Sequence, residues 1–217
     1  MPEWWTYTLS DFLMFSPRTY YRMVELYNLA VWPLQLVGMA IGAAIFALLV
    51  GGRGPMRIIT ALLAVCWLWI AWAFHWQRYA EINWAALWFA AAFVVQAMLL
   101  VVAAVSARYE ITSARAGERS FAALLVALMV VGYPLLAPLT GRSWTTAETF
   151  GATADPTAIA TIAVAALVRG RVRWLLLVIP VLWCVVAAAT LWTMNAPAWL
   201  VVLTAAAIAL WPSFRRR

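Results

Sequence analysis

Residues 173–193 read RWLLLVIPVLWCVVAAATLWT, and only the first of these residues is charged. A helix needs about 20 apolar residues to cross the hydrocarbon core of a bilayer. Trp174 and Trp192 stand near the two ends of the run, about 27 Å apart at a rise of about 1.5 Å per residue. Membrane interfaces favour tryptophan, so this spacing suits a helix that spans the bilayer. The stretch therefore predicts a transmembrane helix.

The rest of the chain has the same apolar character. Of its 217 residues 67% are hydrophobic and 11% are charged, and the mean hydropathy is +0.90. No soluble domain of this size carries that balance, so the composition indicates a membrane protein. We predict an all-α, polytopic membrane helix bundle of about seven transmembrane helices. The predicted spans cover about residues 28–51, 57–77, 82–105, 120–139, 155–168, 173–193 and 196–213.

The arginines test this count independently. All 15 basic residues are arginine, and 11 of them lie in or beside the connections after the first, third, fifth and seventh spans. Because cytoplasmic loops are enriched in basic residues, this alternation favours a bundle with its N-terminus outside and its C-terminus in the cytoplasm.

The N-terminal part differs from the rest. Residues 1–27 contain eight aromatic side chains spaced among charged ones, which predicts an aromatic interfacial segment ahead of the transmembrane bundle over 28–217. Ser16-Pro17 is typical of a helix start, with Ser as the N-cap and Pro at the first helical position. We expect no cleavable signal peptide, since no basic region precedes an apolar core here.

The composition excludes several kinds of chemistry. Two cysteines and one histidine are too few for a four-ligand zinc site or an iron–sulfur cluster, and a retinal Schiff base needs a lysine, which is absent. The basic residues flank the spans, so they do not indicate nucleic-acid binding. We expect that the protein is not an enzyme, has no catalytic residues and binds no metal or cofactor. A single pigment or haem ligand at His75 is a remote alternative to a hydrogen-bonded histidine at the interface.

The fifth span is irregular. Asp155-Pro156 predicts a helix start with Asp155 as the N-cap. From Pro156 to Val168 such a helix measures about 20 Å, short of a hydrocarbon core about 30 Å thick. One interpretation is that residues 141–154 dip inward and form an outward-facing polar pocket. Its candidate members are His75, Glu81, Tyr133 and Asp155. The other interpretation is a capped helix under a surface loop.

Ionisable side chains are almost absent from the middle of the predicted spans, and they gather instead at the outer ends, Asp155 among them. Asn28, Gln35 and Gln96 are the intramembrane polar residues of note, and hydrogen bonds between helices are the simplest role for the two glutamines. Gly38 and Gly42 form a GxxxG pair, which lets another helix approach closely. We favour packing within the bundle over a dimer interface.

Several stretches together carry a resemblance. They are residues 26–35 (LYNLAVWPLQ), residues 75–96 with Ile82-Asn83, Tyr133-Pro134, Phe150-Gly151 and Asp155-Pro156-Thr157. From about residue 20 onward the chain resembles an uncharacterised family of small bacterial multi-pass inner-membrane proteins, catalogued as a domain of unknown function. The resemblance implies a bacterial cytoplasmic-membrane protein, and it supplies no activity and no catalytic residues.

Three functional classes stay open. The favoured one is a non-enzymatic accessory or scaffold subunit of a larger membrane complex, with lipids and other membrane subunits as partners. This class is supported by the absence of recognisable catalytic or metal-binding motifs and by the 15 tryptophans. The alternative is a small-solute transporter or channel with an outward-facing pocket, which the broken fifth span favours. An enzyme that uses His75, Glu81 and Asp155 has the least support.

Overall fold

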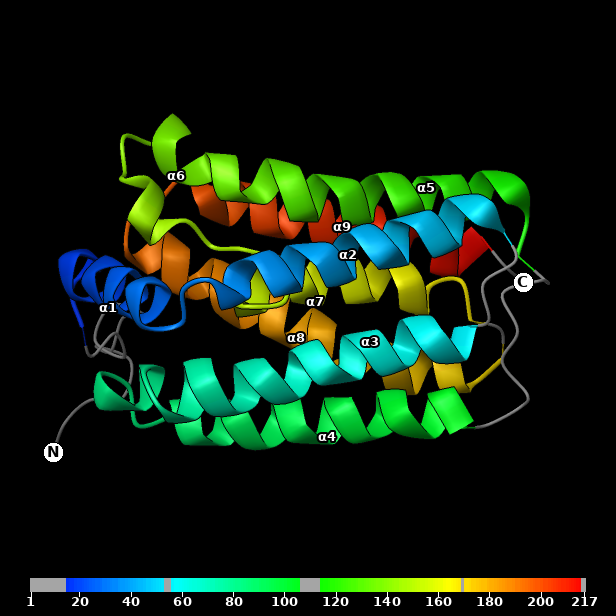
Figure 1. Cartoon of the computed structure of the whole chain (residues 1–217), viewed down its shortest axis with the longest axis horizontal. Helices are drawn as coiled ribbons and strands as arrows, with labels where there is room; N and C mark the ends of the chain where they lie inside the picture. Colours follow the sequence, from blue (N-terminus) through cyan, green and yellow to red (C-terminus); the bar gives the residue numbers. More distant parts are fainter. Residues whose placement is uncertain (1–14, 53–55, 106–113, 169, 216–217) are drawn as a thin grey trace, which may run out of the picture.

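The computed structural model describes residues 15–52, 56–105, 114–168 and 170–215. Every regular element within these ranges is helical (Figure 1). Five helical segments in them are long and apolar enough to cross a membrane, which indicates a membrane-associated helix bundle. These segments are Leu34–Gly51, Met56–Glu81, Ala86–Val105, Ala116–Leu139 and Val172–Thr193.

The first predicted span is divided. Helix α1 runs over Pro17–Ala30, and α2 runs over Leu34–Gly51. The N-cap prediction for α1 is confirmed, because the Ser16 hydroxyl accepts a hydrogen bond from the Thr19 amide at 3.1 Å and Pro17 follows it. The first span, expected over about 28–51, is interrupted between Ala30 and Leu34, as the proline at position 33 predicts. Pro33 stands between α1 and α2, and its ring and missing N–H do not suit a helix interior.

The remaining elements follow in chain order. Helix α3 (Met56–Trp69) continues into a π-helical turn, η3 (Ile70–Trp76), and a second π-helical turn, η6 (Leu128–Gly132), follows α5. The other bounds are η4 Tyr79–Glu81, α4 Ala86–Val105, α5 Ala116–Ala127, η7 Tyr133–Leu135, α6 Leu136–Leu139, η8 Trp144–Thr146, α7 Ala154–Ala165, α8 Val172–Thr193 and α9 Ala198–Arg215.

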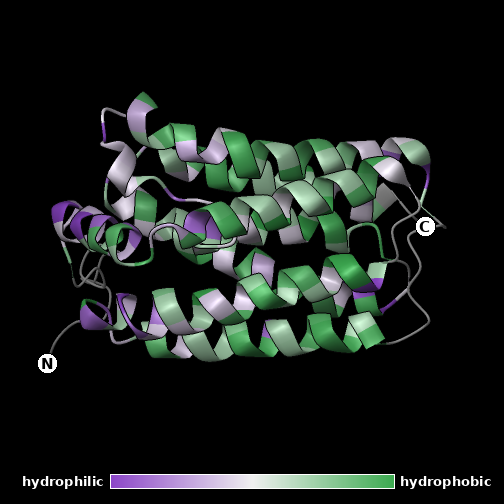
Figure 2. Cartoon of the chain, viewed as in Figure 1, coloured by the Kyte–Doolittle hydropathy of each residue, from purple (hydrophilic) through white to green (hydrophobic). Residues whose placement is uncertain are grey.

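The helices lie roughly side by side in one bundle. Figure 1 shows α3 beside α4 at one side and α5 with α9 at the other, with α2, α7 and α8 between them. Helices α1 and α6 lie at the same end of the bundle, called the α1 end below. Apolar residues cover the helices and hydrophilic ones gather mainly near the ends (Figure 2). Trp88, Val102 and Val131 are each more than half exposed, which suits side chains that face lipid.

Helix α7 is the centre of the bundle. All of its residues are buried, and it packs against α3, α5, α8, α9 and η6. Its sequence, ADPTAIATIAVA, contains nothing larger than isoleucine, so several helices can approach it at once. The N-cap is Thr153 rather than Asp155, so α7 begins two residues earlier than predicted and Asp155 lies in its first turn.

A turn over residues 150–152 leads into α7 and rests against α2. Gly151 has a φ of 78°, and a Cβ there would lie 2.7 Å from the Cα of Gly38. A Cβ on Gly38 would clash with the carbonyl oxygen of Phe150, and one on Gly42 would clash with Val130. The GxxxG face of α2 therefore packs within the chain, as expected, but its partner at Gly38 is a turn rather than a helix.

Candidate functional site

Asp155, in the first turn of α7, is a buried acid. Its carboxylate is buried, and each oxygen accepts a hydrogen bond. The Tyr133 hydroxyl donates to Oδ2 at 3.1 Å, and the Trp183 indole N–H donates to Oδ1 at 2.8 Å. Tyr133 follows the π-helical turn η6, and Trp183 belongs to α8. Three elements that are distant in sequence thus meet at one carboxylate.

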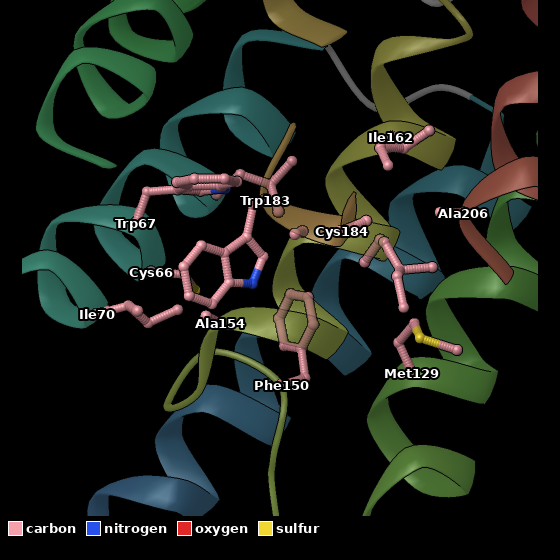
Figure 3. Packing of buried hydrophobic residues seen from close by; sticks show 14 of the residues in the cluster. Cys66, Trp67, Ile70, Met129, Phe150, Ala154, Ile162, Trp183, Cys184 and Ala206 are labelled. Carbon is pink, nitrogen blue, oxygen red and sulfur yellow. The ribbon is translucent and has the colours of Figure 1, made fainter. Parts of the chain in front are cut away.

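This carboxylate lies near the middle of the bundle. Trp183 is the twelfth residue of the 22-residue helix α8, so its indole reaches Asp155 from the helix centre. Figure 3 shows Trp183 close to Ala154 and Phe150, where the turn meets α7. Asp155 still stands at the start of the short helix expected as the fifth span, and that start lies level with the middle of α8. Because α7 begins inside the bundle, its first turn carries the acid to this depth.

A second buried carboxyl, Glu148, lies in the loop between η8 and α7. It is 6% exposed, and its Oε1 accepts a hydrogen bond from the Tyr20 hydroxyl of α1 at 2.9 Å. Burial and then the nearby charge of Asp155 raise the pKa of Glu148, while the charge of Arg142 and the bond from Tyr20 oppose that rise. Two electrostatically coupled acids therefore share this region.

Glu148 and Asp155 are called the carboxyl cluster below, and Tyr20 covers this cluster on the side of α1. Burial first, and then the charge of Glu148, raise the pKa of Tyr20 well above its usual value, so the phenol keeps the proton that it donates. Its ring packs against Phe15, Tyr21 and Tyr79. The Arg142 guanidinium covers the ring of Tyr21, 4.2 Å from its centroid.

The turn and the loop before it are held by side chains of α1. The Tyr27 hydroxyl donates to the carbonyl of Ala152 at 2.7 Å and accepts a bond from the Trp69 indole at 3.1 Å. The Asn28 amide donates to the carbonyls of Thr145 and Ala147 at 2.8 and 2.9 Å. These bonds satisfy peptide groups that have no helical partner, as buried backbone requires.

The two glutamines also bind backbone. Gln35 donates to the carbonyl of Asn28 at 2.7 Å, and thereby links α2 to α1. Gln96, fully buried in α4, donates to the carbonyl of Leu176 in α8 at 3.1 Å. These are the bonds between helices that the sequence favours as their simplest role. Neither glutamine is hydrogen-bonded to Glu148 or Asp155 in the part of the chain that the structure describes.

His75 is near the cluster but not bonded to it. Its side chain is fully buried in η3, with ring centroids 4.4 Å from Phe93 and 4.9 Å from Trp183. Neither ring nitrogen has a hydrogen-bond partner among the described residues. The expectation of a hydrogen-bonded histidine at the interface is therefore wrong. Trp183 links the two groups, because it contacts His75 and donates to Asp155.

Glu81 does not join the other candidate residues. It ends η4, its side chain is 62% exposed, and its carboxylate lies 3.9 Å from Arg78. The structure thus brings Tyr133 into a hydrogen bond with Asp155, packs His75 against Trp183, and leaves Glu81 at the surface. Within the described ranges, no group of three or more His, Cys, Asp and Glu side chains is arranged to hold a metal ion.

Sequence reasoning missed Glu148, Tyr20 and Trp183. Glu148 stands in a loop, and Trp183 is one apolar residue in an apolar run, so neither has a local signal. The two π-helical turns also went unpredicted, and both adjoin the cluster, since η3 carries His75 and η6 directly precedes Tyr133. Such turns occur frequently at functional sites.

Fold and site together define an all-helical bundle, with several helices long and apolar enough to cross a membrane, and two buried carboxyls near the start of its central helix. The model of the Family of unknown function (DUF6064) matches residues 18–217, so the chain belongs to that family. A comparison with curated proteins and one with solved structures found no match.

Proposed function

We propose that the protein is a non-enzymatic transporter of a small solute or ion, with its binding site at the carboxyl cluster of Glu148 and Asp155. The observation that carries the proposal is the break in front of α7, which leaves a buried carboxylate on a helix start level with the middle of α8. Discontinuous helices that begin near the bilayer midplane form substrate and ion sites in many transporters. Acidic side chains at such depth are costly and mark ion or substrate pathways.

The proposed membrane arrangement has seven crossings. The five long segments form the first, second, third, fourth and sixth crossings. The turn at 150–152 together with α7 forms the fifth crossing, and α9 forms the seventh. The α1 end faces outward. Arg57, Arg115, Arg119 and Arg171 lie at the opposite end, where α3, α5 and α8 begin, which supports a cytoplasmic position for that end. We propose the bacterial cytoplasmic membrane as the location.

Transport requires the site to open toward the α1 end. The contacts that close it on that side are the Tyr20–Glu148 bond and the bonds from Asn28 to the loop carbonyls. All of them join α1 to the loop between η8 and α7. Movement of α1 away from this loop would expose Glu148 first and the deeper Asp155 next.

The second candidate is an accessory or scaffold subunit of a larger membrane complex. One observation favours it: both carboxyls are closed from solvent, with Asp155 4% and Glu148 6% exposed. Asp155 also has both oxygens hydrogen-bonded inside the chain. In that role the cluster would hold the loop and α7 in place, and the exposed apolar faces would meet lipids and other membrane subunits.

Reconstitution separates the two candidates. The full chain is placed in liposomes under a pH gradient or a sodium gradient, and flux is followed with internal dyes for each ion. The transporter proposal expects flux that Asp155→Asn abolishes and that Glu81→Gln, which changes an exposed acid, preserves. A chain without flux that purifies from its native membrane in fixed stoichiometry with other subunits overturns the proposal and supports the accessory role.

A further inference from the structure

We infer that the ion bound at this cluster is a proton, and that it resides on Glu148 in the conformation described above. The inference rests on the proposed transport function and names its ion.

Glu148 and Asp155 are both buried, and the charge of Asp155 acts on Glu148, which disfavours ionisation of both carboxyls at once. Neither forms a salt bridge with any cationic side chain in the ranges that the structure describes. Ionising a second buried carboxyl that senses the charge of the first, away from water and without a cation in contact, is costly, so one of the two is expected to keep a proton. We therefore expect one of the two carboxyls to be ionised and the other to be protonated.

The hydrogen bonds assign that charge to Asp155. It accepts from two donors, Trp183 and Tyr133, and hydrogen bonds to the charged form of a carboxyl favour that form. An indole N–H can only donate, so Trp183 requires a lone pair on Asp155. The one bond that the structure gives Glu148 comes from Tyr20, to Oε1. The proton consequently stays on Glu148.

The same donors argue against a metal cation. A cation needs several oxygen lone pairs directed at it, as the six or more ligands of calcium illustrate. Here an N–H and an O–H point at the Asp155 oxygens, and their partial positive charges repel a cation. Trp183 has no lone pair to offer as a ligand. A proton, which needs only one oxygen, suits the site better.

The charged and titratable groups around Glu148 come from each element near it. They are Tyr20 and Tyr21 of α1, Tyr79 of η4, Tyr133 of η7, Asp155 of α7 and Arg142 of its own loop. His75 lies one ring further away, against Tyr79 and Trp183. Of these groups Arg142 is positively charged and Asp155 is the negative partner, so they act on the proton of Glu148 in opposite directions.

Arg142 also indicates where the charge goes when the proton leaves. Its Nη1 is buried and has no hydrogen-bond partner in the described part of the chain. A deprotonated Glu148 is attracted to this guanidinium, because the positive charge of Arg142 favours the ionised form of Glu148 and lowers its pKa. Release of the proton toward the α1 end therefore leaves an anion that Arg142 stabilises.

Infrared titration of the purified full chain tests the inference without any need for transport. A protonated carboxyl has a C=O stretching band that a carboxylate lacks, and carbon-13 labelling of glutamate side chains distinguishes Glu from Asp. We expect a labelled band that remains at pH values where ordinary glutamates are already ionised and that disappears as the pH rises further. In that pH range it should be missing in Glu148→Gln and persist in Glu81→Gln. Absence of such a band at every pH overturns the inference.

Two charge variants give opposite expected shifts. Arg142→Gln removes a positive charge and moves the loss of the band to higher pH, while Asp155→Asn removes a negative charge and moves it to lower pH, each by about one unit or more. These variants keep the test decisive if Glu148→Gln fails to fold. Shifts in the same direction, or none, contradict the pairing.

The flux assay then separates the two proposals. A titrating Glu148 band in a protein without flux supports the proton assignment and overturns the transport function. Flux driven by sodium, with no protonated Glu148 at any pH, supports transport and overturns the proton assignment.

Discussion

Trp183 donates its indole N–H to Oδ1 of Asp155 over 2.8 Å, and the same ring packs 4.9 Å from that of His75. One side chain at the middle of α8 thus joins the carboxyl cluster to the aromatic side chains of η3 and α4. The hydrogen bonds of Asp155 and the aromatic packing around His75 therefore share one residue, Trp183.

Trp183→Phe tests the hydrogen bond from the indole N–H to Asp155. Phenylalanine keeps an aromatic ring and removes the donor, which leaves Oδ1 of Asp155 buried without its partner. We expect a loss of about 1.5–3 kcal/mol in the free energy of unfolding, as for hydrogen bonds to charged groups. Unfolding in detergent is followed by circular dichroism. Trp88→Phe, at a position that is 71% exposed, serves as the control and is expected to change stability by less than about 0.5 kcal/mol.

Gly151→Ala is expected to disrupt the approach of the turn to α2. The new Cβ would lie 2.7 Å from the Cα of Gly38, and the φ of 78° strains any residue other than glycine. We expect a large drop in melting temperature or a failure to fold. Gly117→Ala is the matched control, since a Cβ there meets nothing within 4 Å. Equal melting temperatures for the two variants would contradict the packing described for this turn.

Tyr27→Phe removes a hydroxyl that connects the turn to α1 and α3. Without it the carbonyl of Ala152 and the indole of Trp69 each lose a partner. We expect a destabilisation of about 1–3 kcal/mol and faster hydrogen exchange of the amides in the loop before α7. Tyr21→Phe keeps the ring beneath Arg142 and is expected to exchange like the wild type. Unchanged exchange in Tyr27→Phe would show that other contacts hold the loop.

His75→Phe is expected to preserve or raise the melting temperature. The histidine buries two nitrogens with no partner among the described residues, and an unpaired buried polar group costs about 1–3 kcal/mol. Phenylalanine fills a similar volume among Phe93 and Trp183. Gln96→Leu, by contrast, removes a bond to the Leu176 carbonyl and is expected to destabilise the chain. A marked loss of stability in His75→Phe would indicate that the imidazole has a polar partner.

Stability should fall as the pH rises through the range of Glu148. Its pKa is raised in the folded chain, so the folded state binds this proton more tightly than the unfolded state does. The stabilisation is complete below the ordinary pKa of a glutamate and is lost as the pH rises through the raised value. Melting temperatures from acidic to alkaline pH measure this slope. Glu148→Gln is expected to flatten it and Glu81→Gln to leave it unchanged.

Length and hydropathy were enough to predict the helical bundle, because long apolar runs are a strong local signal. Ser16-Pro17 correctly predicted the start of α1 for the same local reason. The short fifth run left two interpretations open, an inward dip of residues 141–154 and a capped helix under a surface loop. Tyr133, one of the expected neighbours of Asp155, is hydrogen-bonded to it. These features all follow from spacing along the chain.

The rest depends on contacts between distant residues. Tyr20 and Glu148 are 128 residues apart, and nothing near either of them in the sequence indicates the other. Trp183 stands in an apolar run where any large side chain would satisfy the hydropathy. Glu81 was wrongly grouped with Asp155, because a polar residue near the end of a span can face either the interior or the solvent.

The complete burial of α7 has a consequence for how the protein is made. None of its residues meets lipid, and the turn before it has peptide groups that lipid cannot satisfy. A ribosome delivers this stretch before α8 and α9, which later cover it. It cannot settle in the bilayer alone, so we expect it to remain at the insertion machinery until α8 has emerged. Chains truncated before Trp183 should then leave this stretch outside the membrane, open to proteases.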